Sequence, residues 1–139
     1  MYAVDSDHLW YFDGHSWEVQ ANVEFSSAPS ELTGLRGEPL EEDLLVVLVE
    51  SSGVPQAHLY QDSAWSQATL PGFWSQWFKA AASEEEIIVV DGIGRIVSFD
   101  GSDWSDQSQI INSPVRALIT GRDGAYYLGG DDRMLLRKD

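Results

Sequence analysis

The chain has 139 residues, of which 43% are hydrophobic and 12% aromatic, a composition typical of one folded domain. It carries 23 acidic and 8 basic residues, a formal net charge of -15, which argues against nucleic acid as a partner because phosphate binding depends on neutralising cations. The absence of cysteine excludes disulfides and thiolate metal sites from the interactions that stabilise the fold.

In chain order, the sequence predicts short antiparallel strands, because β-branched and aromatic segments alternate with Gly, Asp and Pro. The first unit, residues 1–27, has three expected strands: Tyr2–Val4, Leu9–Phe12 and Trp17–Val23. The second unit, residues 31–70, has four: Leu32–Arg36, Asp43–Val49, Gln56–Tyr60 and Trp65–Leu70. The turn-rich segment 50–55 is expected to be a lengthened hairpin loop.

The second half of the chain continues this pattern. The third unit, residues 71–111, has four expected strands: Phe73–Lys79, Glu86–Val90, Arg95–Phe99 and Trp104–Ile110. The fourth unit, residues 113–139, has three: Val115–Thr120, Ala125–Leu128 and Arg133–Arg137. Helix is an alternative at Glu38–Leu44 and at Lys79–Ile87, where helix formers gather, but the repeat frame places a connection there. We expect an all-β chain with two complete and two trimmed units.

One sequence motif, which we call the repeated phrase, occurs in three of these units. Residues 9–17, LWYFDGHSW, return as residues 96–104, IVSFDGSDW, and residues 59–65 keep the aromatic residue, the turn acid and the Trp. Such repetition predicts a repeat architecture in which each unit buries its apolar face against the next. The Asp-Gly pairs are expected to form turns and the Trp residues to pack between units. The structural residues of the repeat are therefore Trp17, Trp65, Trp104, Asp13, Gly14, Asp100 and Gly101.

Residues 92–104, GIGRIVSFDGSDW, resemble a blade of bacterial β-propellers, in which a Gly-rich turn, an apolar strand, an aromatic-Asp-Gly turn and a Trp recur. Residues 113–118 and 123–130 resemble the innermost and second strands of the next blade. The resemblance implies a β-propeller-like fold of about four short antiparallel blades, and it implies no site residues. Propellers normally need more residues, so a compact monomer and a homodimer that completes one larger ring are both open.

Two acidic clusters provide the candidate partner-binding residues. Each precedes the central strand of a complete unit, and equivalent connections of a propeller open on the same end of the ring. Together they would form one negative rim that attracts a protein with a basic surface. Solvated loops that keep the protein soluble are the alternative. The cluster residues are Glu38, Glu41, Glu42, Asp43, Glu84, Glu85 and Glu86.

The sequence contains no pattern that indicates catalysis, a cofactor or a metal site. No nucleophile has an identifiable base, and no phosphate-binding loop is present. Asp100, Asp103 and Asp106 lack the alternating spacing of a calcium loop, and no spacing brings His8 and His58 together on zinc. We therefore expect no enzyme activity, no cofactor and no metal ion.

The leading functional hypothesis is a non-catalytic acidic protein-binding module, for example an immunity or antitoxin protein that masks a basic toxin. One alternative is a carbohydrate-binding lectin that uses the repeated Trp residues. Another is an assembly unit or fragment of a larger propeller with no ligand of its own. Acids at Asp5 and Asp7 stand where an export signal needs positive charge, and the longest apolar run, 44–49, cannot span a bilayer. We expect a cytoplasmic protein with no membrane partner.

Overall fold

The computed structural model describes residues 1–35, 44–51, 54–71, 78–83, 86–111, 115–131 and 135–138. Across these residues the chain forms fourteen strands and no α-helix, which confirms the predicted all-β class. No helix among them is long and apolar enough to cross a membrane.

The strands form four antiparallel sheets, each with its strands in chain order. Sheet I contains β1 (Tyr2–Val4), β2 (His8–Phe12) and β3 (Trp17–Asn22). Sheet II contains β4 (Pro29–Leu35), β5 (Leu44–Ser51), β6 (Val54–Gln61) and β7 (Ala64–Thr69). Sheet III contains β8 (Phe78–Ala82), β9 (Ile87–Asp91), β10 (Arg95–Phe99) and β11 (Trp104–Ile110). Sheet IV contains β12 (Val115–Thr120), β13 (Tyr126–Gly130) and β14 (Leu135–Lys138).

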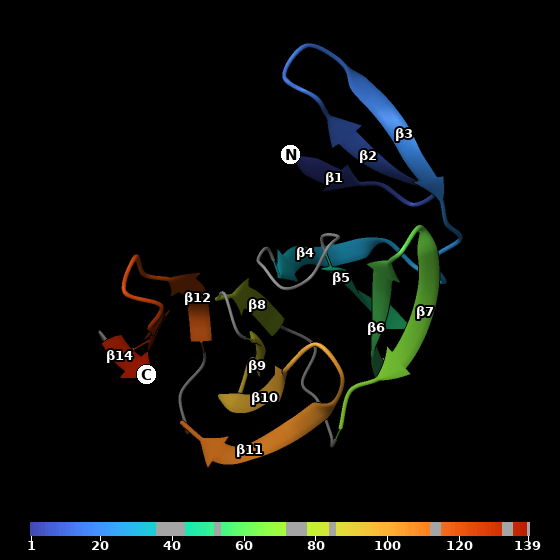
Figure 1. The fold of residues 1–139 in the computed structure, drawn as a ribbon. Coiled ribbons are helices and arrows are strands. Elements are labelled where there is room, and N and C mark those ends of the chain that lie inside the picture. The colour runs from blue at the N-terminus through green and yellow to red at the C-terminus, as the bar shows by residue number, and fades with distance from the viewer. Residues whose placement is uncertain are drawn as a thin grey trace.

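The sheets are arranged so that their first strands are neighbours. β1 contacts β4, β4 contacts β8, and β8 contacts β12. In Figure 1 the sheets follow one another around an arc, from sheet I at the top to sheet IV at the left, and these two end sheets are well separated. Each inner sheet therefore has a neighbour on both sides, whereas sheets I and IV each present one face that no other described sheet covers.

Hydrophobic clusters join each sheet to the next. Leu9 of sheet I packs with Leu45 and Tyr60 of sheet II. A larger cluster of β5, β9 and β10 residues joins sheets II and III. A third cluster joins Ile88 of sheet III to Leu118 of sheet IV. The hydrophobic core is thus divided into three sheet-on-sheet interfaces that follow one another along the arc.

The two most apolar segments of the sequence form strands inside this stack. Residues 44–49 of β5 and residues Ile87–Asp91 of β9 are buried along their whole length. A strand with a packed sheet on each side needs apolar residues at every position and not only at alternate ones. This explains why these segments read as continuous apolar runs in the sequence.

The aromatic-Trp pairs of the repeated phrase occupy equivalent places in three sheets. Phe12 stands directly opposite Trp17, and Phe99 stands opposite Trp104, with ring centroids 5.2 Å and 4.8 Å apart. In sheet II the equivalent pair is formed by Tyr60 and Trp65, 5.0 Å apart. β2, β6 and β10 are therefore equivalent strands, so β1 corresponds to β5 and β9, and among the described residues sheet I has no counterpart of β4 or β8.

The first strand of sheet III extends further than predicted. The sequence predicts Phe73–Lys79; residues 72–77 lie outside the described part of the chain, Phe78 and Lys79 are in the strand, and the strand continues to Ala82. The helical alternative over Lys79–Ile87 is wrong for residues 79–82, because they pair with β9. This strand contacts both β4 and β12, and Ala81 is buried in the cluster between sheets III and IV.

The hairpin between β5 and β6 also differs from the expectation of a long loop over residues 50–55. Glu50 pairs with Pro55 and Ser51 with Val54, so the ladder continues almost to the end of the hairpin. The additional residues of this unit therefore lengthen the two strands and not the loop between them.

We predict that the two equivalent tryptophans, Trp17 and Trp104, differ in their contribution to stability. Trp104 packs against the cluster between sheets II and III, so Trp104→Ala should lower the free energy of unfolding by about 3 kcal/mol. Trp17 has 47% of its surface exposed, so Trp17→Ala should cost less than about 1 kcal/mol. Urea unfolding of the two variants measures this difference, and equal losses would contradict the conclusion that, of the two, only Trp104 is packed against a neighbouring sheet.

Candidate functional site

Most of the predicted acidic rim cannot be placed. Glu38, Glu41, Glu42, Asp43, Glu84 and Glu85 lie outside the described residues. Glu86 is described, and its carboxylate accepts a hydrogen bond from Lys138 Nζ at 3.3 Å. This ion pair joins the connection before β9 to the last strand of sheet IV. The part of the rim that can be observed thus contacts the protein itself.

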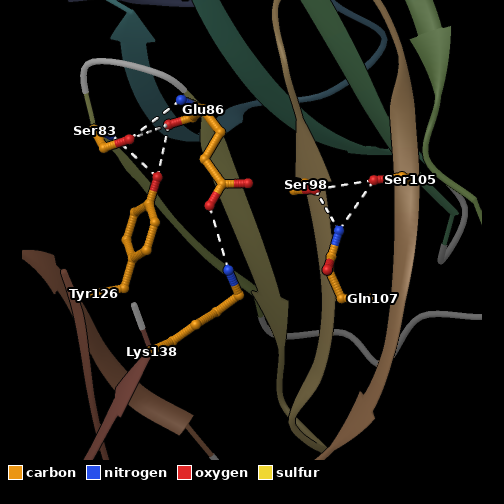
Figure 2. Close-up of polar contacts among 7 residues, drawn as sticks. All are labelled: Ser83, Glu86, Ser98, Ser105, Gln107, Tyr126 and Lys138. Atoms are coloured by element: carbon orange, nitrogen blue, oxygen red, sulfur yellow. Dashed lines mark hydrogen bonds and ion pairs between the residues drawn. The ribbon is translucent and has the colours of Figure 1, made fainter. Parts of the chain in front are cut away.

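A polar cluster around Tyr126 connects sheets III and IV (Figure 2). The buried Tyr126 hydroxyl donates to the Glu86 carbonyl oxygen at 2.7 Å and accepts from the Ser83 backbone N–H at 3.2 Å. Ser83 Oγ accepts from the Glu86 backbone N–H at 3.2 Å. Burial raises the pKa of the Tyr126 hydroxyl. The cluster pairs each of these polar groups at a packed interface, which is a structural role.

Figure 2 also shows a second polar cluster, across β10 and β11. Ser98 Oγ and Ser105 Oγ are 3.0 Å apart, and Gln107 Nε2 donates to both, at 2.6 Å and 3.1 Å. A serine nucleophile needs a base that removes its proton, and an amide donor does not supply one. These residues therefore form a cross-strand hydrogen-bond ladder.

The predicted turn aspartates accept hydrogen bonds from the backbone of their own turns. Asp13 Oδ1 accepts from the N–H groups of His15 and Ser16, at 2.7 Å and 2.9 Å. The Ser16 and His15 N–H groups lower the pKa of Asp13, and those of Asp103 and Ser102 lower the pKa of Asp100 in the same way. Gly14 and Gly101 follow with φ of 107° and 99°, which L side chains rarely adopt.

The degraded copy of the phrase in sheet II uses a different turn. Gln61 pairs with Ala64, so only Asp62 and Ser63 form the loop. Both have positive φ, 52° and 61°, as in the two-residue turns that match the twist of a hairpin. The four-residue Asp-Gly turns and this two-residue turn bring the following Trp to the same place.

A cluster of side chains of metal-ligating type lies in the first turn. Asp5, Asp7 and His8 each place one potential ligand atom within 4.8 Å of the other two. Asp5 accepts from the N–H groups of Asp7 and His8, at 2.8 Å and 2.7 Å, and from Trp10 Nε1 at 2.9 Å. The Asp7 N–H, followed by the Trp10 indole, lowers the pKa of Asp5 to about 2. Because these three donors already occupy the Asp5 carboxylate, we assign the cluster a role in stabilising the turn and not in binding a cation.

Two of the three repeat tryptophans pack against the preceding sheet. Trp104 of sheet III lies against the cluster that includes sheet II, and Trp65 of sheet II against the cluster that includes sheet I. Trp17 has the same place in sheet I, where no described sheet precedes it, and 47% of its surface is exposed. The predicted packing between units thus applies to Trp65 and Trp104 and fails for Trp17, because the neighbour is missing.

Trp17 belongs to an aromatic face, which we call the leading face. The pairing of β1, β2 and β3 places its members on one side of sheet I, opposite the side that packs on sheet II. Val19 is 47% exposed, like Trp17. The residues of the leading face are Ala3, Trp10, Phe12, Trp17 and Val19.

Sheet IV has an uncovered face at the other end of the arc, which we call the trailing face. Leu118 packs on sheet III, so the neighbouring residue Ile119 points to the opposite side, where it is 62% exposed. Leu135 of β14 shares this side and is 73% exposed. The pairing of β12, β13 and β14 assigns the following residues to the trailing face: Ala117, Ile119, Tyr127, Gly129, Leu135 and Arg137.

A cleft of about 450 Å³ lies between sheets II and III. Gln61, Ser66 and Gln67 of sheet II and Ser102 and Trp104 of sheet III are among the residues that line it. Its volume is within the range of small-molecule sites, and it combines an aromatic ring with polar groups. Sequence analysis missed this cleft, because it depends on how two hairpins lie beside each other.

His58 is a half-buried residue on the side of β6 that faces sheet I. Its Nε2 atom is buried without a hydrogen-bond partner, and the Phe25 ring lies edge-on to the imidazole ring, with ring centroids 5.0 Å apart. Burial lowers the pKa of the His58 imidazole. A protonated His58 would therefore weaken the contact between sheet II and the segment that follows β3.

Comparison of the chain with protein-family models, with curated proteins and with solved structures finds no match. A functional assignment therefore has to come from the faces and the cleft described above.

We predict that His58 makes the protein less stable in mild acid. The unfolded chain binds a proton near the ordinary pKa of 6.5, whereas the folded chain resists it, so stability is full above that pH and falls as pH falls below it. Urea unfolding between about pH 7 and pH 5 should show this slope in the native protein and a smaller one in His58→Gln. His15→Gln, at an exposed turn position, is the control, and equal slopes in both variants would contradict the prediction.

Proposed function

We propose that this chain is a non-catalytic protein-binding module whose four sheets are propeller-type blades arranged in an open arc. Three features support the blade assignment: antiparallel sheets in chain order, neighbouring first strands in sheets II, III and IV, and an aromatic-Trp pair that packs on the preceding sheet in sheets II and III. In this arrangement the end blades, and not a central channel, present the binding surface.

The exposure of Trp17 is the observation that carries the proposal. Aromatic residues are enriched in protein interfaces, and soluble proteins rarely leave a contiguous apolar patch uncovered. Trp65 and Trp104 show what covers this position elsewhere in the chain, namely the apolar face of another sheet. A partner with a similar apolar face would complete the same contact at Trp17.

The negative charge of the segment that carries the leading face indicates the charge expected on the partner's surface. The first 35 residues contain no Lys or Arg. A partner surface with basic groups around an apolar centre would therefore be attracted to sheet I, and like-charged proteins would be repelled. A basic toxin bound by an immunity protein has this chemistry. The acids in this segment are Asp5, Asp7, Asp13, Glu18, Glu24 and Glu31.

Photo-crosslinking from position 17 tests this proposal. With p-benzoylphenylalanine in place of Trp17, we expect a polypeptide to be crosslinked in the cells that produce the protein. The same group in place of Ile93, an exposed residue of the turn after β9, is the control. The identified pair is then purified, and Trp17→Ala should weaken its affinity at least about tenfold, with further weakening as salt is raised.

Two results would contradict the proposal. Crosslinking from position 17 could equal that from position 93, which would mean that the leading face has no specific partner. Alternatively, the purified pair could bind equally well with Trp17→Ala, which would place the contact elsewhere.

The cleft favours a second function, the binding of a small polar ligand such as a monosaccharide. Sugar rings stack on indoles and accept or donate hydrogen bonds at amide and hydroxyl groups. Trp104 supplies the ring and Gln61, Ser66 and Ser102 supply polar groups beside it. Sugar binding in the cleft needs no partner protein and uses a different part of the chain from the leading face.

Saturation-transfer NMR with a panel of monosaccharides tests this second function. We expect a signal from at least one sugar, lost or weakened about tenfold in the double variant Gln61→Ala, Ser66→Ala. Gln20→Ala, an exposed glutamine of sheet I, is the matched control and should bind normally. Absence of any signal, or equal binding by both variants, would exclude the sugar.

A further inference from the structure

We propose that the partner of the leading face is the trailing face of a second copy of this chain, so that copies join head to tail. This inference rests on the proposed function, because it names the occupant of the same binding face. It adds that the protein supplies both halves of the interface.

The first argument is the repeated contact inside the chain. Leu9, Ala57 and Ile96 each lie three residues before the aromatic of the repeated phrase and pack on the following sheet, with 0%, 0% and 2% of their surface exposed. Leu135 of β14 also points away from the preceding sheet, and it is 73% exposed. Sheets I, II and III each use this face to pack on the next sheet. Sheet IV has the same face, and no described sheet covers it.

The second argument is that the two open faces are complementary in kind. In the contact between sheets II and III, Phe99 and Trp104 pack on aliphatic residues such as Leu59 and Ala57. The leading face supplies the aromatic half of such a contact through Phe12 and Trp17, and the trailing face supplies an aliphatic half. The contact between copies would continue the one that already occurs between sheets.

The third argument is charge. Residues 1–25 contain five acids, Asp5, Asp7, Asp13, Glu18 and Glu24, and no Lys or Arg. Residues 115–138 contain five bases against three acids, although the chain as a whole has a net charge of -15. A head-to-tail contact brings these opposite charges together, whereas contact between two leading faces would bring acids together. The interface is therefore heterologous and closes into a ring or extends, depending on its angle.

Two single substitutions test the contact, because each removes one half of it. Trp17→Glu blocks the leading face and Leu135→Glu blocks the trailing face. We expect the native protein to form assemblies in sedimentation velocity between about 1 µM and about 0.3 mM, and each variant alone to be monomeric. An equimolar mixture of the two variants should form a 1:1 dimer and nothing larger, since one intact interface remains.

Ile93→Glu adds the same charge at an exposed apolar residue outside both faces and should assemble like the native protein. Circular dichroism and thermal unfolding check that each variant is folded. If either variant is unfolded, Val19→Glu and Ile119→Glu replace the pair, because both side chains are exposed on the same two faces.

A native protein that stays monomeric over the whole concentration range would overturn self-association. It would leave the proposed function intact if position 17 still crosslinks to another polypeptide. An assembling native protein whose two variants fail to combine in the mixture would overturn the head-to-tail contact, and so would loss of assembly in Ile93→Glu.

Discussion

The packing of one sheet's aromatic-Trp pair on the aliphatic face of the sheet before it is the contact on which this structure depends. It occurs where sheet II meets sheet I and where sheet III meets sheet II, through Trp65 and Trp104 respectively. The pair is presented by a hairpin whose turn differs between copies but whose strand register places the two rings directly opposite each other. Because the contact is directional, sheet I leaves its aromatic-Trp pair uncovered, and sheet IV leaves uncovered the side that carries Ile119 and Leu135.

This directionality gives the exposed aromatic residues of sheet I a physical explanation. Trp17 is not an isolated surface residue, because Phe12 stands opposite it and Val19 shares its face. The acidic composition also has a spatial pattern, since the bases of the chain gather toward sheet IV and are absent from sheet I. The apolar and electrostatic features of the two ends thus support the same interpretation of the protein as a binding module.

Much of the fold follows from local patterns in the sequence. The continuous apolar run of β9, and the Asp-Gly turn between β10 and β11, predict strands and a hairpin at the observed places. The end of the first strand of sheet III is not predictable in this way, because Ala80, Ala81 and Ala82 have helix propensity and form a strand through pairing with β9. The cleft and the two open faces depend on which hairpins become neighbours. A single sequence contains that information only through the repeat.

The division of the hydrophobic core into three successive interfaces also has a consequence for motion. Sheet I is held through one interface, near Leu9, whereas β5 and β9 are enclosed on both sides. Opening of an end sheet therefore exposes less apolar surface than opening of an inner one, so fluctuations should start at the termini of the arc and progress inward. Amide hydrogens would then exchange with solvent fastest in the end sheets, β1 to β3 and β12 to β14, and slowest in β5 and β9, and any partner that covers an end would slow exchange there first.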